Sequence, residues 1–439
     1  MQNDFPYETI KKMVTDCGLP EVGLASIREL RKLVADIEAK TGIRFVRMEM
    51  GIPGLPAPAF ALEAEATALK NGVASYYPEI EGIPELREEA ARFIKNFLDL
   101  KAQSHNCFAS VGAMQACFAT LLVAGRMDKE RNTVLLLEPC FPVHKQMIKM
   151  IGLNVEGFDV FNFRGRALKA QLEGFLKKGN IACILYSNPN NPSWICFTEE
   201  ELKIIADLAT QYDVLILEDL AYLCMDFRED LGKPGTPPFQ ATIGHYTDKY
   251  VIFISSSKIF SYAGQRVGLI FVPDSVLSLN KPDLLRYYPS ANFGHALVYG
   301  SLYATTSGVS HSAQWGLQAL LKAANEGKYD FVAAVREYGR RAKAMKEIFL
   351  KYGFHLIYDH DGDKPLADGF YFTIGYPGLS GRQLVKELLC HGISAIALET
   401  TGSRQEGVRA CVSFVGPDQF ATLEKRLALF QIHNPLSAK

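Results

Sequence analysis

Short apolar runs alternate with longer amphipathic stretches through the middle of the chain. Six runs are almost continuously hydrophobic, as strands covered on both faces are: CFASV (107–111), TVLLLE (133–138), IACILY (181–186), VLILE (214–218), YVIFI (250–254) and GLIFV (268–272). Helical patterns lie between them, for example at 113–123 and 199–211, and Thr198 with Glu201 forms a capping pair before the second. This alternation predicts an α/β fold in which a mostly parallel sheet lies between helices.

The two ends of the chain show a different order of elements. Residues 22–40 have an amphipathic helical pattern, which the Pro/Gly-rich turn region 51–60 follows. Beyond residue 330 the patterns predict, in order, a helix near 333–352, a strand at 369–374, a helix near 381–391 and a strand at 408–414. We therefore expect a small α+β domain built from both termini (1–65 and 329–439) and a large domain at 66–328.

Composition and charge exclude several classes of protein. With 48% hydrophobic and 22% charged residues, the chain has the balance of an ordinary globular protein and not of a disordered one. Its net charge is −1 without a long Lys/Arg run, which argues against a nucleic-acid or anionic-membrane surface. The nine cysteines are dispersed without a CxxC pair, so we expect reduced thiols and no metal site. The start lacks a signal-peptide core and no run of about eighteen apolar residues occurs, which predicts a soluble cytoplasmic protein.

A lysine follows the fifth apolar run. In SSSKIFSYAGQRVG (255–268), Lys258 comes just after the strand, and ligands of open α/β sheets bind at the carboxyl ends of strands. The hydroxyls of Ser255 and Ser257 and the guanidinium of Arg266 are donors that suit a phosphate. Taken alone, the segment could also be a surface lysine in a serine-rich turn.

Polar residues also follow two other runs. VLILEDLAY (214–222) ends in Asp219, which can pair with a cationic ring nitrogen, and in Tyr222, which can donate to a ring oxygen. Asn191, in NPNNPSW (188–194), is a second donor of this kind. The alternatives are a helix-capping acid at 218–219 and an ordinary Pro/Asn turn.

Two more segments complete the set of candidates. In VGAMQAC (111–117), Gly112, Ala113 and Met114 would present backbone N–H groups at a helix N-terminus, which is a ready anion site. In PCFPVHK (139–145), Phe141 could stack on a planar ring. An ordinary strand–helix turn and a core aromatic are the alternatives.

In this order, the segments resemble the class I/II aminotransferases, which are fold type I enzymes similar to aspartate aminotransferase. The SxSK…GxRxG run, the DxAY strand end and the NPxNP segment are the most specific parts. The resemblance extends over most of the chain: Tyr77 and Gly82, Gly112 to Met114, Phe141, Asn191, Asp219 and Tyr222, Ser255 to Lys258, Arg266, and Arg409. It implies an aspartate-aminotransferase-like fold and a pyridoxal 5′-phosphate (PLP) cofactor held covalently as an aldimine on Lys258.

The candidate residues match what PLP requires from a protein. Lys258 would form the aldimine and then act as general base. Asp219 would hold the pyridine nitrogen, Tyr222 and Asn191 would donate to the ring oxygen, and Phe141 would stack on the ring. The phosphate is expected to be held by Gly112, Ala113, Met114, Ser255, Ser257 and Arg266.

The resemblance also implies residues for the substrate and for a second subunit. Arg409 would bind the substrate α-carboxylate, although an exposed strand arginine is common, and Gly51 would form a backbone wall beside the substrate. Tyr77 would reach the phosphate of the neighbouring subunit in a homodimer with shared active sites. Arg286 is a candidate for a second cation, but Tyr287 and Tyr288 suit an apolar side chain equally, so the substrate side chain is left open.

We therefore expect an enzyme that moves an amino group between an L-amino acid and a 2-oxo acid by a ping-pong mechanism. The family segment usually reads Asn-Pro-Thr-Gly, whereas Ser193 and Trp194 follow Asn191-Pro192 here, and the indole could reshape the rim of the site. A PLP-dependent lyase, decarboxylase or oxidase on the same scaffold therefore stays open. A regulatory PLP-fold protein is disfavoured because the residues before GIPGLP show no basic helix–turn–helix pattern.

Overall fold

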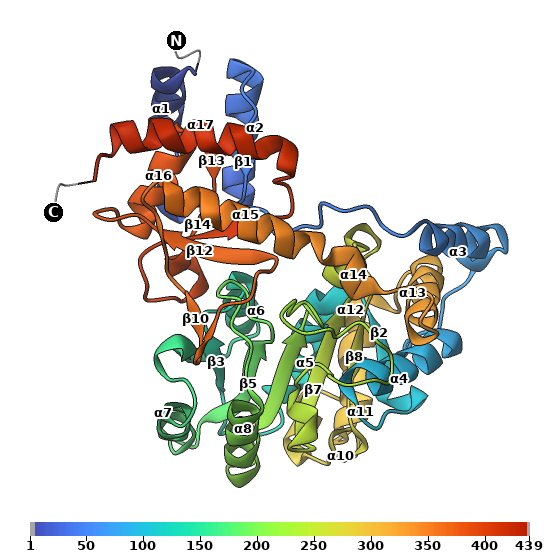
Figure 1. Cartoon of the computed structure of the whole chain (residues 1–439). Coiled ribbons are helices and arrows are strands. Elements are labelled where there is room, and N and C mark those ends of the chain that lie inside the picture. Colours follow the sequence, from blue (N-terminus) through green and yellow to red (C-terminus); the bar gives the residue numbers. More distant parts are fainter. Residues whose placement is uncertain (1–4, 437–439) are drawn as a thin grey trace. The chain divides into compact units, whose positions relative to one another are not determined.

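The computed structural model describes residues 5–436, which divide into two compact units (Figure 1). Unit 1 contains the chain up to Gly54, the short segment Asn191–Ile195 and the chain from Arg336 onward. Unit 2 contains Leu55–Asn190 and Cys196–Val335. The sequence-based division after residues 65 and 328 stays a prediction. No helix among residues 5–436 is long and apolar enough to cross a membrane.

Unit 2 is built on a seven-stranded sheet in the order β2-β8-β7-β6-β5-β3-β4. Only β8 is antiparallel to its neighbours, so the predicted α/β architecture is confirmed. The strands are β2 (Cys107–Ser110), β3 (Thr133–Glu138), β4 (Asn154–Asp159), β5 (Ile181–Ser187), β6 (Leu215–Leu220), β7 (Tyr250–Ser255) and β8 (Gly268–Phe271). The six apolar runs all form strands, and the half-buried β4 is added at the edge of the sheet.

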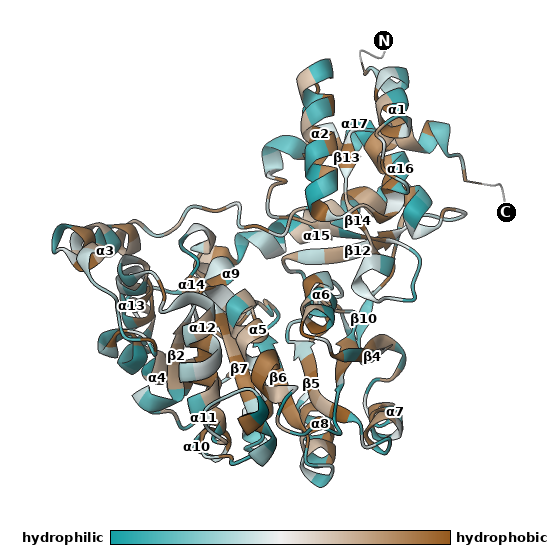
Figure 2. Cartoon of the chain, turned by 180° about the vertical axis from the view of Figure 1, so that it is seen from behind, coloured by the Kyte–Doolittle hydropathy of each residue, from teal (hydrophilic) through white to brown (hydrophobic). Residues whose placement is uncertain are grey.

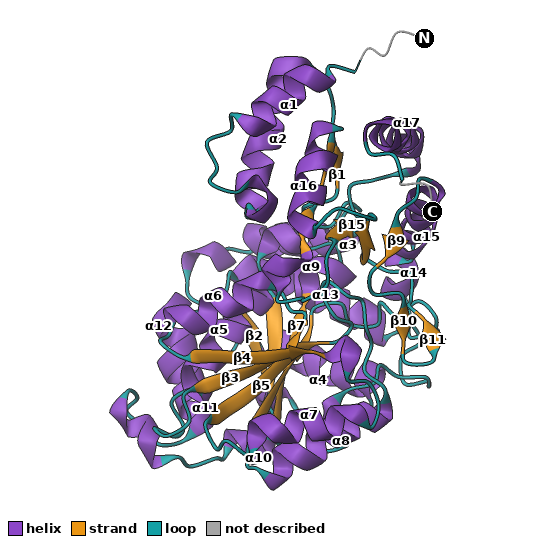
Figure 3. Ribbon diagram, turned by 90° about the vertical axis from the view of Figure 1, so that its left-hand side faces the viewer, coloured by secondary structure: helices purple, strands orange, loops and turns teal. Residues whose placement is uncertain are grey.

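Helices lie on both faces of this sheet, and its central strands are hydrophobic along their length (Figures 2 and 3). One face packs against α5 and a π-helical segment at Ala296–Leu302. The helices of unit 2 are α3 (Ala59–Lys70), α4 (Pro84–Leu98), α5 (Gly112–Ala124), α6 (Pro142–Met150), α7 (Ala167–Leu176), α8 (Glu199–Gln211), α9 (Ser256–Ile259), α10 (Asp274–Leu277), α11 (Phe293–His295), α12 (Tyr303–Thr306), α13 (His311–Asn325) and α14 (Phe331–Val335). Thr198 and Glu201 form the predicted capping box of α8.

Unit 1 contains a four-stranded antiparallel sheet in the order β14-β15-β12-β9 and a parallel pair of β1 and β13. Its strands are β1 (Val46–Arg47), β9 (His355–Leu356), β10 (His360–Asp361), β11 (Lys364–Pro365), β12 (Tyr371–Gly375), β13 (Ile393–Ser394), β14 (Ile396–Ala397) and β15 (Val408–Cys411). Its helices are α1 (Tyr7–Thr15), α2 (Ile27–Thr41), α15 (Glu337–Lys351), α16 (Gly381–Cys390) and α17 (Pro417–His433). The single helix expected near 333–352 is two helices, α14 and α15, which belong to different units.

A pair of histidines joins the C-terminal ends of α16 and α17 within unit 1. The Nδ1 of His391 lies 2.7 Å from the carbonyl oxygen of Glu387, and its Nε2 lies 2.9 Å from Nδ1 of His433. Because a carbonyl only accepts, Nδ1 of His391 carries the proton and its Nε2 accepts from His433. The ring of Tyr7 packs on both imidazoles. Burial lowers the pKa of His391 to about 4, so this ring is neutral at pH 7.

We expect the free energy of unfolding to fall as the pH is lowered from about 6.5 to about 4. Across this range the unfolded chain binds a proton at His391 that the folded chain excludes, so the contribution is complete above the range and is lost within it. Urea titrations at several pH values measure the effect. His391→Gln should weaken the pH dependence more than the exposed control His355→Gln. Equal dependence in both variants would show that His391 is not its source.

Candidate active site

Lys258 and Asp219 lie at the carboxyl ends of neighbouring parallel strands in unit 2. β6 pairs with β7 in a register that sets Asp219 opposite Phe253, and Lys258 lies on α9, which begins directly after β7. Because β6 and β7 are parallel neighbours, about 4.8 Å apart, both residues lie at the edge of the sheet formed by the carboxyl ends of its parallel strands. Lys258 is half-buried and Asp219 is buried. The sheet therefore brings together the two residues expected to flank the cofactor ring.

The carboxylate of Asp219 is held by neutral donors. Ser187 donates to Oδ2 at 3.3 Å, and the backbone N–H of Ala221 donates to Oδ1 at 3.1 Å. Burial raises the pKa of Asp219 to about 6, against the opposing effect of these two hydrogen bonds. A cation beside this carboxylate would favour its ionised form, so the group suits a protonated ring nitrogen.

His144 is a residue of this site that the sequence analysis did not single out. It lies on α6, and its Nε2 is 3.6 Å from Oδ2 of Asp219. Burial lowers the pKa of His144 to about 4, so the imidazole is neutral at pH 7. Its ring meets that of Phe141 edge-on, with centroids 5.6 Å apart. The signal available in the sequence was a histidine three residues after the candidate stacking aromatic.

Gly112 and Arg266 meet at the start of α5. A Cβ atom on Gly112 would lie 2.6 Å from Nη2 of Arg266, so only a glycine allows this close approach. Gly112 also has φ +67°, a conformation in which glycine avoids the strain of other residues. The strand register brings the two residues together. Ser110, two residues before Gly112, pairs with Gly268 of β8, which lies two residues after Arg266. Ser255 of β7 pairs with the same glycine from the other side.

The group around Gly112 has the donors that a phosphate requires. The N-terminus of α5, with Ala113 and Met114 in its first turn, offers backbone N–H groups and the positive end of the helix dipole. Arg266 adds a permanent positive charge. The hydroxyl of Ser255 accepts from the N–H of Ser257 at 3.2 Å and keeps its own proton to donate. This donor set fits a phosphate dianion.

Replacing Gly112 with alanine should weaken binding of PLP to the apoenzyme by about 10- to 100-fold, since charge-assisted hydrogen bonds are each worth about 1.5–3 kcal/mol. The added methyl group would displace the guanidinium of Arg266. Gly152→Ala is the matched control, because Gly152 has φ +79° and no atom within 4 Å of the added Cβ. Fluorescence titration with PLP measures both affinities. Equal losses in the two variants would mean that backbone strain alone, and not Arg266, is responsible.

The remaining candidates of unit 2 have different environments. Tyr222 is buried in the turn that follows β6, and Phe141 is half-buried as the residue before α6. Tyr77 is 83% exposed, between α3 and α4. That exposure is what a residue needs if it is to reach another subunit.

Unit 1 holds the candidate substrate residues Arg409, Asn191 and Gly51. Arg409 lies on β15 and is only 1% exposed, so the alternative of an exposed strand arginine is wrong. Its Nη1 donates to Oδ1 of Asn191 at 3.3 Å, and its Nη2 donates to the carbonyl of Glu49 at 2.7 Å. Its Nε has no hydrogen-bond partner, and no carboxylate of residues 5–436 forms an ion pair with it. Because a buried charge is costly without a counter-charge, this guanidinium suits an anionic ligand.

Trp194 does not lie at the rim of a site, contrary to the expectation from its sequence position. It is fully buried within unit 1, where its indole packs directly over Gly369. A Cβ on Gly369 would lie 1.9 Å from Cε2 of the indole, so the missing side chain there makes the space that Trp194 fills.

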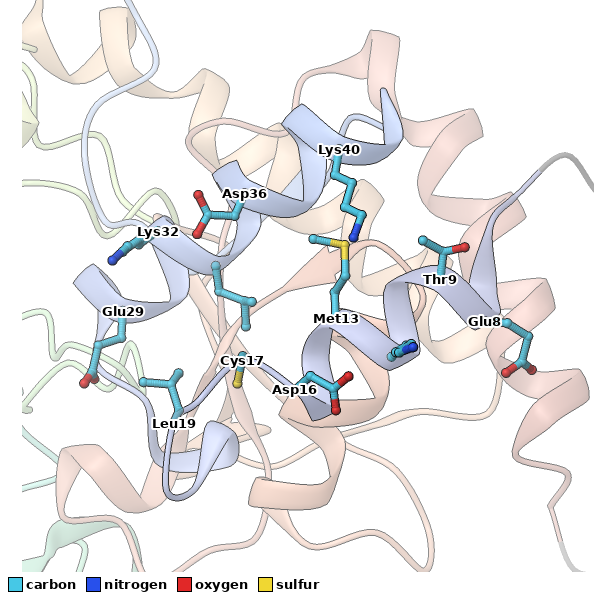
Figure 4. A pocket seen from close by; sticks show the side chains of 12 residues that line it. Glu8, Thr9, Met13, Asp16, Cys17, Leu19, Glu29, Lys32, Asp36 and Lys40 are labelled. Atoms are coloured by element: carbon cyan, nitrogen blue, oxygen red, sulfur yellow. The ribbon is translucent and has the colours of Figure 1, made fainter.

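A separate groove of about 850 Å³ lies between α1 and α2 in unit 1 (Figure 4). Side chains of both charges line it, including Glu8, Lys12, Asp16, Lys32 and Asp36. None of the candidate site residues belongs to its lining. The groove therefore adds nothing to the candidate active site.

The model of the family "aminotransferase class I and II" matches residues 48–415, so the chain belongs to this family. It is 26% identical to a probable aspartate aminotransferase of Methanocaldococcus jannaschii over 309 residues, which cover 69% of this chain and 74% of the relative. It is 25% identical to the putative aminotransferase YugH of Bacillus subtilis over 390 residues, which cover 88% and 90% of the two chains.

Solved structures give the same fold. Aspartate aminotransferase from Thermus thermophilus with maleate superposes with a TM-score of 0.74 at 18% identity, covering 95% of this chain and 98% of the other. Aspartate aminotransferase from Thermotoga maritima gives 0.73 at 19% identity, covering 96% and 99%. The predicted aspartate-aminotransferase-like fold, the aminotransferase class and the PLP cofactor of this family are thereby confirmed.

Proposed function

We propose that Lys258 is the lysine that carries PLP and that the enzyme transfers an amino group from an L-amino acid to a 2-oxo acid. The observation that carries the proposal is the emergence of Lys258 and Asp219 from neighbouring parallel strands at one edge of the sheet. Ligands bind at this edge in open α/β sheets. PLP belongs to the family, and the residues at this edge fit its reactive aldehyde and its ring nitrogen.

The phosphate of PLP is proposed to bind where Gly112 and Arg266 meet. Arg266 supplies the charge, and the first turn of α5, with Gly112, Ala113 and Met114, supplies backbone donors. Ser255 and Ser257 add hydroxyl groups. Met114 has no polar side chain, so its contribution is limited to its backbone N–H.

The ring is proposed to be held by four side chains. Asp219 pairs with the ring nitrogen in its ionised form, and the neutral His144 beside it leaves the carboxylate as the only charge of the pair. Tyr222 and Asn191 donate to the ring oxygen, and Phe141 stacks on the ring. Bound PLP supplies an aldehyde and an electron sink for the electrons released at the substrate Cα.

Three residues are proposed to act on the substrate. Arg409 binds the α-carboxylate through the edge of its guanidinium that Asn191 and Glu49 leave open, and Gly51 lines the site with backbone only. The amine of Lys258 takes the proton from the substrate Cα and delivers it to the carbon that receives the amino group. Fixing the carboxylate limits the orientations that the substrate can adopt, which is the orientational part of catalysis.

The reaction type is tested by one turnover without an acceptor. Holoenzyme mixed with single L-amino acids should release one equivalent of 2-oxo acid per active site and no ammonia, because the amino group stays on the enzyme. Adding a second 2-oxo acid should restart turnover. Continuous ammonia release without an acceptor would instead support the lyase alternative.

A homodimer with shared active sites is proposed for the enzyme. Five tyrosines of unit 2 are more than half exposed: Tyr76, Tyr77, Tyr287, Tyr299 and Tyr303. Tyr299 donates to the carboxylate of Glu81, which brings the segment after Tyr77 beside the π-helical segment. Exposed aromatic groups of this kind support a subunit interface, with Tyr77 reaching the partner's phosphate. Light scattering should give twice the chain mass of 48.7 kDa, and a monomeric enzyme with full activity would contradict the proposal.

A cytoplasmic location is also proposed. No disulfide joins any of the nine cysteines, which all lie within residues 5–436, as expected for a reducing compartment.

A further inference from the structure

The register of two neighbouring strands places the ring of Tyr371 against the guanidinium of Arg409. β12 and β15 are antiparallel, with Thr373 opposite Arg409 and Tyr371 opposite Cys411. Side chains two residues apart share a face of the sheet, so Tyr371 is the diagonal neighbour of Arg409, within reach of an aromatic ring. The guanidinium carbon lies 4.5 Å from the centre of the Tyr371 ring. This is a cation–π contact in a buried environment, where such contacts are strongest.

Two glycines and a tryptophan fix this ring in place. A Cβ on Gly51 would lie 2.0 Å from the hydroxyl of Tyr371, so the backbone there blocks movement of the ring. On another side, the indole of Trp194 meets the ring edge-on at 6.1 Å. The indole itself is held over Gly369.

The backbone conformation of Trp194 is strained. Trp194 has φ +65°, which costs a residue with a side chain about 1–2 kcal/mol. Strain of this kind persists where the surrounding packing determines the conformation, and it marks sites where position matters. The strained backbone here keeps the indole over Gly369 and against Tyr371.

We propose that Tyr371 and Trp194 are positioning residues for the substrate carboxylate. The ring of Tyr371 covers one face of the Arg409 guanidinium, while Asn191 and the carbonyl of Glu49 take up one N–H on each of two nitrogens. A carboxylate can then approach only along the remaining edge, which includes Nε. Trp194 acts through Tyr371 by holding its ring. This inference rests on the proposed role of Arg409.

The test compares holoenzyme variants with small ligands. Because these ligands have at most a methyl group as side chain, differences in side-chain recognition do not affect the measurement. The probes are L-alanine, ethylamine, which lacks the carboxylate, and propionate, which lacks the amine. The readouts are the ratio of single-turnover rate constants for L-alanine and ethylamine, and the dissociation constant of propionate. The cofactor absorbance and the melting temperature of each variant are recorded alongside.

Tyr371→Leu should lower the rate ratio and weaken propionate binding by about 30-fold each, the size of a desolvated cation–π contact. Tyr371→Phe keeps the ring and should stay within about 3-fold of wild type. Gly369→Ala should reduce both readouts as well, because the added methyl group displaces the indole. None of the three should change the absorbance of the bound cofactor.

Tyr376→Leu is the matched control. Tyr376 is equally buried in unit 1, but its ring packs on Phe354 and Phe430. It should lose stability and keep the wild-type rate ratio. If Tyr371→Leu behaves like this control, Tyr371 is a core residue and the inference is overturned.

Arg409→Leu separates failure of this inference from failure of the proposed function. If it abolishes the preference for L-alanine while Tyr371→Leu does not, only the positioning role fails. If Arg409→Leu leaves the preference for L-alanine unchanged, Arg409 does not bind the substrate carboxylate. Its proposed role and the positioning role of Tyr371 and Trp194 are then both wrong.

Discussion

Lys258→Ala is expected to reduce the transamination rate by about 10³-fold or more, because the substitution removes both the covalent attachment and the general base. The half-buried lysine lies directly after β7, at the edge of the sheet where Asp219 also emerges. PLP should still bind to the variant through its phosphate and ring nitrogen. The bound cofactor should then show the absorbance of the free aldehyde.

Stopped-flow spectroscopy with a reactive amino acid measures the loss. Lys145→Ala is a suitable control, since this lysine follows Phe141 on α6 and pairs with Glu138 at 2.5 Å. It should retain covalent cofactor and most of the rate. Normal turnover by Lys258→Ala would remove the basis of the proposed mechanism.

Asp219→Asn is expected to lower the rate by about 10²- to 10⁴-fold, because breaking a buried ion pair costs about 3–5 kcal/mol. The amide keeps the size of the side chain and loses the negative charge that stabilises a protonated ring nitrogen. Ser187→Ala, which removes one neutral hydrogen bond to the same carboxylate, should cost far less.

The pH dependence of cofactor binding gives a second signature of Asp219. Its pKa of about 6 in the absence of the ring means that the carboxylate gains a proton as the pH falls through this value. The affinity of the wild-type apoenzyme for PLP should therefore decrease below about pH 6. Asp219→Asn should lack this decrease, as followed by fluorescence titration across the pH range. An unchanged pH profile in the variant would assign the dependence to another group.

Elements that carry a continuous apolar pattern were predictable from the sequence. The buried strands β5, β6 and β7 read as hydrophobic runs because both of their faces are covered. β4 escaped prediction because NVEGFD is a half-buried edge strand with a mixed pattern. The helices α1 and α17 were also not predicted.

The candidate site was predictable where a motif follows a strand directly. Lys258 and Asp219 are of this kind, since the order of parallel strands brings their carboxyl ends to one edge. His144 and Tyr371 were missed because their contacts depend on tertiary packing, which neither the position of His144 after Phe141 nor a tyrosine in a strand pattern shows in the sequence. For the same reason the sequence did not reveal that Asn191–Ile195 packs as part of unit 1, where Gly369 leaves room for Trp194.

The most direct test of the central claim identifies the lysine that carries the cofactor. Native holoenzyme is reduced with sodium borohydride, which fixes PLP to its lysine, and the labelled peptide is sequenced by mass spectrometry. We expect a single phosphopyridoxyl group on Lys258, within the peptide that follows β7. Stoichiometric labelling of a different lysine would contradict the account.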